Sequence, residues 1–197
     1  MTREHTPLVN RRYYKEIKLN LELIRLNPDN KDRKYFEQVN NEAFPLSERM
    51  NFDEIFDFAS DTDTDVLGIY DDGNPVGFAV LLKNAECGYV YFIAIDSHTR
   101  SKGYGGAAMR KMMEVYPELQ LVLDFEVIDD NAENNAQRIR RKNFYLRNGF
   151  HETGNYTMLR DDRFEVVCSG GELRKAALKD LLRIIHKHRP EFPDVLI

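Results

Sequence analysis

The alternation of apolar and polar positions divides the chain into segments with strand and helix periodicity. Short apolar runs rich in β-branched and aromatic residues predict strands at 19–26, 66–70, 76–82, 88–95, 119–128, 150–159 and 164–168. Apolar residues at helical spacing predict helices at 32–44, 52–59 and 136–147, with two more that end before Pro117 and Pro190. Hairpin-forming strands come first and strand–helix–strand–helix units follow, and this order predicts an α+β fold with a mixed sheet.

The stretch 89–116 organises the rest of the chain. It reads as a buried strand, a polar turn, a glycine-rich loop and a helix, and Gly103, Gly105 and Gly106 fall within four positions of one another. The apolar stripe predicted for this helix consists of Ala108, Met112, Val115 and Tyr116.

A glycine loop at a helix start is suited to holding an anion. The first N–H groups of a helix are unpaired and carry a partial positive charge. Without Cβ atoms on the three glycines, a phosphate can come close to the backbone. Arg100 and Lys102 add cations at the mouth of the loop. The stretch therefore predicts a pyrophosphate-binding loop, and the alternative is a glycine-rich turn that only caps the helix.

Two motifs identify the kind of loop. The spacing matches neither G-x-x-x-x-G-K-[ST] nor G-x-G-x-x-G, and the motif present is R-x-x-G-x-G, from Arg100 to Gly105. About 40 residues later, Phe144 to Phe150 has the form F-Y-x-x-x-G-F, with Gly149 as a helix stop. In this order and spacing, the two motifs resemble those of the GNAT superfamily of N-acetyltransferases, over roughly residues 21–168.

The resemblance implies a mixed, mostly antiparallel central sheet flanked by helices, here with an additional C-terminal helix. It implies that acetyl-coenzyme A is the cosubstrate and that a primary amine attacks it directly in a ternary complex, without a covalent enzyme intermediate. The amine belongs to a small molecule or to a peptide. A non-catalytic acyl-coenzyme A-binding sensor or scaffold domain is the alternative function.

The resemblance also assigns a cofactor site. The central strand is expected to pair with the pantetheine arm through its backbone and to supply an N–H for the oxyanion, while the loop holds the pyrophosphate. The cofactor-binding residues expected on this basis are Ile93, Ala94, Ile95, Arg100, Ser101, Lys102, Gly103, Tyr104, Gly105 and Gly106. One position departs from the family pattern, because Arg138 stands where the usual asparagine lies seven residues before the tyrosine of the second motif.

Tyr145 matches the tyrosine that serves as general acid in the family. A phenol with a pKa of about 10 stays protonated at neutral pH and can donate to a departing thiolate. For the base, the sequence favours Glu126, which shares a strand face with Asp124 on a segment expected to splay from the central strand. Glu86, or a water chain relayed by backbone carbonyls, is the alternative base, and an exposed polar face is the alternative role for the two acids.

The family places its acceptor site against the first two helices. Glu48 and Arg49 lie at the break between those helices, and we expect them either to touch the substrate or to lie in a solvated loop.

Composition limits the remaining possibilities. With 197 residues and 42% apolar residues the chain fits one domain at 19–168, with an arm at 1–18 and a helix within 169–197. A net charge of −5 argues against a nucleic-acid partner. No run approaches the ~20 apolar residues that span a bilayer, and no secretory signal is seen. Cys87 and Cys168 are predicted to be reduced and packed, which favours a cytoplasmic location.

The C-terminal segment is predicted to form an amphipathic helix. Ser169 to Glu172 fits a capping box, and Leu178, Leu181, Leu182 and Ile185 form an apolar stripe. This helix is expected to pack on the domain or on a second subunit, so a homodimer is a further expectation. His186 and His188 would face different ways on it, and the sequence predicts no metal site.

Overall fold

The computed structural model describes residues 19–99, 102–159 and 162–190. Its elements in chain order are β1 (Leu21–Arg25), α1 (Arg33–Ala43), α2 (Phe52–Asp61), β2 (Thr64–Asp71), β3 (Asn74–Lys83), β4 (Cys87–Ile95), a 3₁₀ turn (Ser97–Thr99), α3 (Tyr104–Val115), β5 (Gln120–Glu126), α4 (Asn135–Arg147), β6 (Phe150–Leu159), β7 (Asp162–Ser169) and α5 (Lys175–His188). The predicted α+β fold is confirmed, including the C-terminal helix. The arm predicted over residues 1–18 lies outside the described part of the chain.

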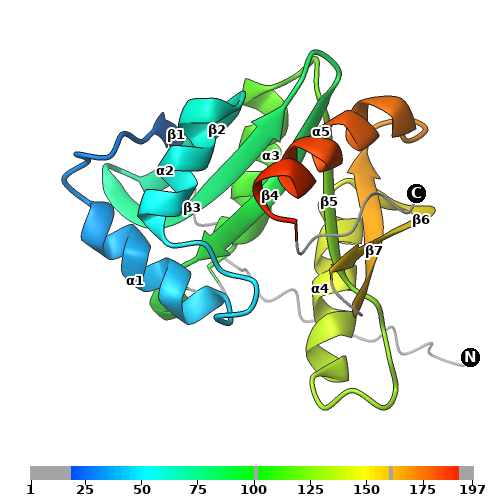
Figure 1. Cartoon of the computed structure of the whole chain (residues 1–197). Coiled ribbons are helices and arrows are strands. Elements are labelled where there is room, and N and C mark those ends of the chain that lie inside the picture. The colour runs from blue at the N-terminus through cyan, green and yellow to red at the C-terminus, as the bar shows by residue number, and fades with distance from the viewer. Residues whose placement is uncertain (1–18, 100–101, 160–161, 191–197) are drawn as a thin grey trace, which may run out of the picture.

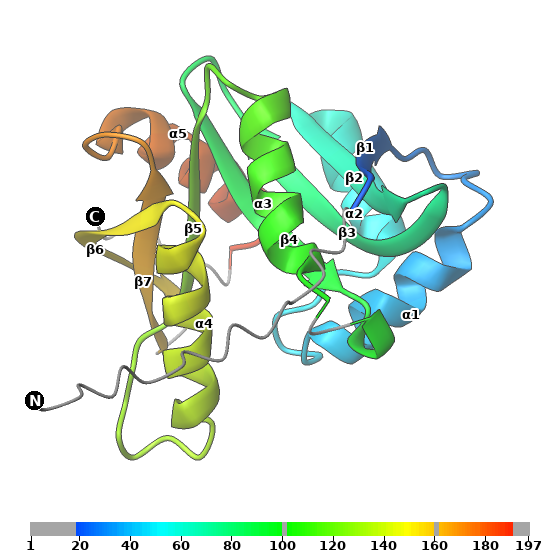
Figure 2. The same ribbon diagram turned by 180° about the vertical axis from the view of Figure 1, so that it is seen from behind.

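One seven-stranded sheet runs through the molecule in the order β1-β2-β3-β4-β5-β7-β6. Every neighbouring pair is antiparallel except β4 and β5, which are parallel. Helices α1, α2 and α5 cover one face of the sheet, and α3 and α4 cover the other (Figures 1 and 2). The chain therefore builds two core layers that share the sheet.

The pairing of β4 with β5 is short. It joins Cys87 to Gln120, Gly88 to Leu121 and Tyr89 to Val122, and beyond these three pairs the strands diverge (Figure 1). On its other side β4 continues to pair with β3, with a register shift between Val80 and Leu81 that makes Tyr91 an extra residue in β4. The splay expected from the sequence is thus present, and it opens at the end of β4 that leads to the glycine loop.

The C-terminal helix packs on its own domain. Its apolar face contributes Ala177, Leu178, Leu181 and Ile185 to the core beneath α1 and α2, and all four are buried. A second subunit would therefore need a different surface, and the homodimer stays a prediction.

The capping box predicted at the start of this helix is wrong. Helix α5 begins at Lys175, and its N-cap, Arg174, makes no side-chain cap. Gln120 holds the preceding segment instead, because its side chain donates to the Glu172 carbonyl at 3.1 Å and accepts from the Arg174 N–H at 2.8 Å. The two bonds join residues that are 52 and 54 positions apart in sequence, and they hold the backbone before α5 in a non-helical path.

Helix α3 buries a slightly different stripe from the predicted one. Ala108, Met109 and Met112 are fully buried against the sheet, but Val115 is 47% exposed. The buried residues are spaced by one and by three positions. The helix face that contacts the sheet is therefore rotated slightly from the predicted apolar stripe. Tyr116, just beyond the helix, reaches Asp65 on β2 with its hydroxyl at 2.7 Å.

Both cysteines are free and buried, as predicted. Among the described residues no helix is long and apolar enough to cross a membrane.

Because Leu178 is fully buried beneath the sheet, Leu178→Ala should lower the free energy of unfolding by about 2–5 kcal/mol, the usual cost of deleting a buried leucine side chain. Leu46→Ala is the matched control, because Leu46 is 83% exposed, and its effect should stay within about 0.5 kcal/mol. Chemical denaturation of both variants measures the difference. Equal small effects would show that α5 does not contribute to the core.

Candidate active site

The glycine loop ends in a left-handed turn at the start of α3. Gly103 is the N-cap residue and has φ of +88°, a conformation that strains residues with a side chain. Tyr104 then anchors the helix start, because its hydroxyl donates to Asp71 on the β2–β3 hairpin at 2.8 Å. Lys102 is exposed at this end of the helix. Arg100 and Ser101, which the sequence also places in this site, lie outside the described residues.

The other two glycines face a neighbouring helix. A Cβ on Gly105 would lie 3.1 Å from the Phe144 ring, and a Cβ on Gly106 would lie 2.5 Å from Asn148 Oδ1. Both contacts come from α4 and its end. The absence of side chains at 105 and 106 is therefore explained by close packing of α3 on α4, a reason that the loop motif alone did not reveal.

The backbone of β4 offers unpaired groups where β5 has moved away. Asp96 N–H donates to the Val76 carbonyl at 2.9 Å, so by the alternation of an antiparallel ladder Ala94 also directs its backbone groups toward β3. Ile93 and Ile95 alternate with Ala94 and Asp96 along the strand, so their backbone N–H and C=O groups point toward the opening. Of the three predicted cofactor contacts on this strand, two thus have backbone groups free of strand pairing among the described residues, and Ala94 does not.

Tyr145 lies on α4 in an aromatic cluster. Its ring stacks on Phe125 of β5, with centroids 5.5 Å apart and planes at 13°, and meets Phe144 and Phe150 edge-on. Burial raises the pKa of Tyr145 to about 12. Its hydroxyl forms no hydrogen bond with any residue that the structure describes, so a protonated phenol remains available to a ligand.

Glu126 is enclosed by cations from α4. Its carboxylate accepts from Arg141 Nη1 at 2.8 Å and from Asn134 Nδ2 at 3.1 Å, and Arg138 Nη2 lies 3.3 Å away. Arg138 also donates to the Val127 carbonyl at 2.9 Å. The departure from the family pattern at 138 therefore serves to fix the end of β5, and Glu126 is part of that network.

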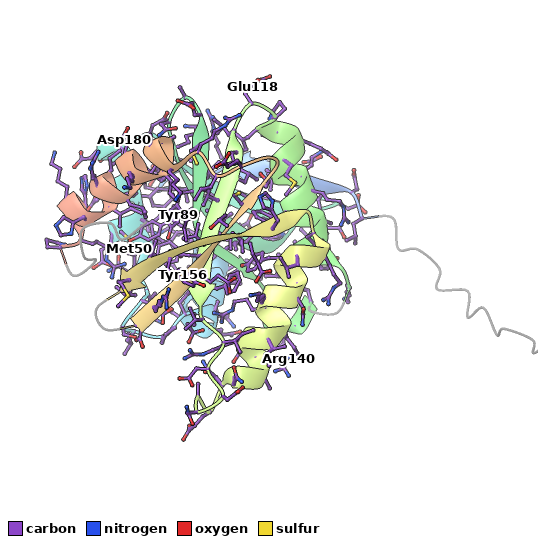
Figure 3. All side chains as sticks on the ribbon, turned by 90° about the vertical axis from the view of Figure 1, so that its right-hand side faces the viewer. Met50, Tyr89, Glu118, Arg140, Tyr156 and Asp180 are labelled. Atoms are coloured by element: carbon purple, nitrogen blue, oxygen red, sulfur yellow. The ribbon has the colours of Figure 1, made fainter. Side chains whose placement is uncertain are left out.

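Asp124 has a different environment, made of neutral donors. Tyr89 on β4 donates its hydroxyl to Oδ1 at 2.9 Å, and Thr157 on β6 donates to Oδ2. Burial raises the pKa of Asp124, while the hydroxyls of Thr157 and Tyr89 act in the opposite sense. Figure 3 shows Tyr89 near the centre of the molecule, with Arg140 on α4 away from it.

Sequence reasoning named Asp124 only as the neighbour of Glu126. An aspartate inside the apolar run L-V-L-D-F-E-V was a signal for a partnered, partly buried carboxylate. Nothing in the sequence indicated that Tyr89 and Thr157 would be the partners, because they come from strands on opposite sides of β5.

The loop between α1 and α2 faces these acids. Burial raises the pKa of Glu48, and the carboxylates of Glu126, Asp162 and Asp124 act in the same direction, against Arg141. Arg189, at the end of α5, donates to the Glu48 carbonyl at 3.3 Å. Glu48, which the sequence assigns either to a substrate contact or to a solvated loop, therefore lies within electrostatic range of the carboxylates of β5.

Glu86 lies elsewhere. It precedes β4, and its carbonyl accepts from Gln120 N–H at 3.0 Å, at the end where β4 and β5 are still paired. The alternative base is thus at the closed end of the splay, several residues from Ile93.

A cavity of about 410 Å³ lies between α2 and the end of α5. Its lining residues are Arg49, Met50, Glu54, Asp57, Phe58, Asp61, His188 and Arg189. Phe58 also packs on Tyr91 of β4, with ring centroids 5.7 Å apart, so one wall of the cavity adjoins the strand that borders the opening.

Within the described part of the chain, one group of side chains has metal-ligand atoms that lie within 4.8 Å of one another: Glu42, Asp96 and His98. Each already has a protein partner, since Glu42 accepts from Ser97, Asp96 from Tyr35, and His98 contacts Asp96. The expectation that the protein uses no metal stays a prediction.

Comparison with known proteins gives a consistent result. The model of the acetyltransferase (GNAT) family matches residues 32–150. A search of curated proteins finds no match.

Solved structures share the fold at low sequence identity. A GNAT-family acetyltransferase structure from Bacteroides thetaiotaomicron aligns with a TM-score of 0.67 and 23% identity, over 84% of this chain and 96% of that chain. Arabidopsis thaliana Naa50, in complex with the bisubstrate analogue CoA-Ac-MVNAL, has a TM-score of 0.54 and 17% identity over 77% and 99% of the two chains. Spermidine N-acetyltransferase from Vibrio cholerae, in complex with CoA and spermine, has a TM-score of 0.55 and 16% identity over 75% and 94%.

The packing of α3 on α4 predicts a clash in Gly106→Ala, because the new methyl group would meet Asn148. We expect a loss of about 1–3 kcal/mol of stability. Adding Asn148→Ala should recover part of that loss, with a coupling of at least about 0.5 kcal/mol in a double-mutant cycle.

Gly171→Ala is the control for this cycle, since a Cβ there would meet nothing within 4 Å. Thermal or urea unfolding of the four variants gives the coupling. Strictly additive effects of the substitutions at 106 and 148 would contradict the proposed helix contact.

Proposed function

The chain belongs to the GNAT family of acetyltransferases, and on this premise we propose that it is an acetyl-coenzyme A-dependent N-acetyltransferase that acts on a primary amine. The single observation that carries the proposal is the opening between β4 and β5, at the end of β4 that leads to the glycine loop and α3. A thioester in this opening would have the backbone donors of β4 beside it, and the partly buried phenol of Tyr145 would serve as the proton donor.

The proposed cofactor site combines two features of the chain. The start of α3 presents its free N–H groups at Gly103 to Gly106, where a pyrophosphate would bind, with Lys102 beside it and Arg100 and Ser101 as further expected contacts. The free backbone positions Ile93 and Ile95 would pair with the pantetheine arm. An N–H of one of them would donate to the oxyanion of the tetrahedral intermediate.

Tyr145 is proposed as the general acid. Loss of coenzyme A from the tetrahedral intermediate leaves a thiolate that needs a proton, and a phenol with a pKa of about 12 is protonated at any pH at which the enzyme would work. Because the hydroxyl has no partner among the described residues, it would not have to leave a hydrogen bond before it donates.

The acceptor amine must lose a proton before it attacks. Glu126 was the base favoured by the sequence and is still a candidate. The carboxylates on this face of the opening, with Glu48 in the loop opposite, would attract an ammonium ion. The nearby cavity of about 410 Å³ is within the size range of small-molecule sites, so a small amine fits this side of the molecule.

The test is acetyl-coenzyme A thiol release with a panel of primary amines, in wild type and in Tyr145→Phe. We expect amine-dependent release in wild type and a fall in kcat of about 10²–10⁴-fold in the variant, the usual contribution of a general acid. Binding of acetyl-coenzyme A should be unchanged, because the aromatic ring that packs on Phe125 is kept.

Tyr116→Phe is the matched control, since that hydroxyl bonds Asp65 on β2, and β3 separates β2 from the strand that borders the opening. It should retain wild-type kcat. Tight binding of acetyl-coenzyme A without turnover on any amine would support the sensor instead, and no binding would mean that the glycine loop only caps a helix.

A further inference from the structure

The innermost carboxylate of the opening is Asp124. The last pair that joins β4 to β5 is Tyr89 with Val122, and Asp124 is the second residue beyond it. Val122 faces the core beneath α1, α2 and α5, while Leu123 and Phe125 face the opposite core. By strand alternation, Asp124 lies on the same face of the sheet as Val122, the face that α1 and α2 cover. Glu126 is two residues farther out along the same face.

The two carboxylates differ in what holds them. Glu126 is paired with Arg141 and Arg138, so its negative charge is compensated by two guanidinium groups. Asp124 is held by two hydroxyls, from Tyr89 and Thr157, and the described residues place no cation within ion-pair distance of it. Its orientation is therefore fixed while its negative charge is not compensated.

We propose that Asp124 is the general base of the transfer reaction, and that Tyr89 and Thr157 are positioning residues that aim its carboxylate into the opening. The proposal rests on the proposed function and names the group that this function leaves open. An ammonium ion is the natural partner for a fixed, uncompensated carboxylate in a partly dry site.

Every proton moved in the proposed transfer has a donor and an acceptor. The acceptor ammonium gives one proton to Asp124, and the neutral amine nitrogen attacks the thioester carbon. The new C–N bond forms as the carbonyl π-electrons move to oxygen. When the carbonyl reforms, the C–S bond breaks and the thiolate takes the proton of Tyr145. The amide nitrogen returns its extra proton to the Tyr145 phenolate, and Asp124 releases its proton to water.

The groups around Asp124 come from three strands, one helix and one loop. Tyr89 and Tyr91 lie on β4 with ring centroids 6.0 Å apart, Glu126 lies on β5, and Thr157 lies on β6. On α4, Tyr145 is within electrostatic range of both Asp124 and Arg141, and Glu48 approaches from the α1–α2 loop. Burial in this setting raises the pKa of Asp124, which brings the carboxylate closer to the range useful for a base.

The experiment measures kcat/KM against pH for the full chain with acetyl-coenzyme A and the best amine of the panel. Asp124→Asn should lower kcat/KM by at least about 10²-fold and remove the acidic limb of the profile. Thr157→Val should keep the limb but move it up by about 0.5–1 pH unit, because the lost hydroxyl no longer stabilises the ionised form. Asp180→Asn, an exposed change on α5, should leave the profile unchanged.

Each result has one meaning. Equal binding of acetyl-coenzyme A by all variants shows that they are folded. An active wild type whose Asp124→Asn variant keeps the acidic limb, or whose limb disappears in Glu126→Gln instead, overturns the role of Asp124 and leaves the proposed function intact. A Thr157→Val limb at the wild-type pH removes the positioning role. A wild type that binds acetyl-coenzyme A but acetylates no amine overturns the function and, with it, this proposal.

Discussion

The divergence of β4 from β5 is the constraint on which the candidate site depends. Buried backbone N–H and C=O groups need partners, and the sheet supplies them to β4 on both sides for only three residue pairs. Beyond Tyr89 one edge of the strand is left to water or to a ligand, although the strand itself is held rigidly by β3. The extra residue at Tyr91 shifts the register of β4 against β3 at the point where the opening begins. The fold thus makes a strand edge inside the molecule, on a strand that β3 pairs along its other side.

The opening also determines the chemistry of the acids along β5. In a fully paired sheet, alternation would direct Val122, Asp124 and Glu126 into one apolar layer, which would be costly for two carboxylates. Here the strands diverge, and each carboxylate is stabilised by a different set of partners. Glu126 near the outer end is neutralised by guanidinium groups, whereas Asp124 near the vertex has hydroxyl donors. Of two acids on one strand face, one is therefore ion-paired and the other is held by neutral hydrogen-bond donors.

The sequence predicted the order and type of the elements well, because each depends on local periodicity and on the turn and stop residues beside it. The motifs at 100–106 and 144–150 also indicated the loop and the helix from which the candidate site is built. Features that depend on contacts distant in sequence were not predictable. Gln120 hydrogen-bonds the segment that precedes α5, and Thr157 hydrogen-bonds the carboxylate of Asp124. The Phe144 ring fills the space beside Gly105. The predicted capping box failed for this reason, since its local pattern was right and a distant side chain overrode it.

Helix α4 connects the two halves of the candidate site. One side of it packs on the glycines of α3, where Phe144 and Asn148 occupy the space that side chains at 105 and 106 would fill. The next residue, Tyr145, stacks on Phe125 of β5, and Arg141 one turn earlier holds Glu126. A shift of α3 against α4 by the width of a methyl group would therefore move the phenol relative to the loop proposed to bind the pyrophosphate. In this arrangement the glycines would position the proposed acid as well as admit a phosphate, because protein interiors are close-packed and transmit small displacements.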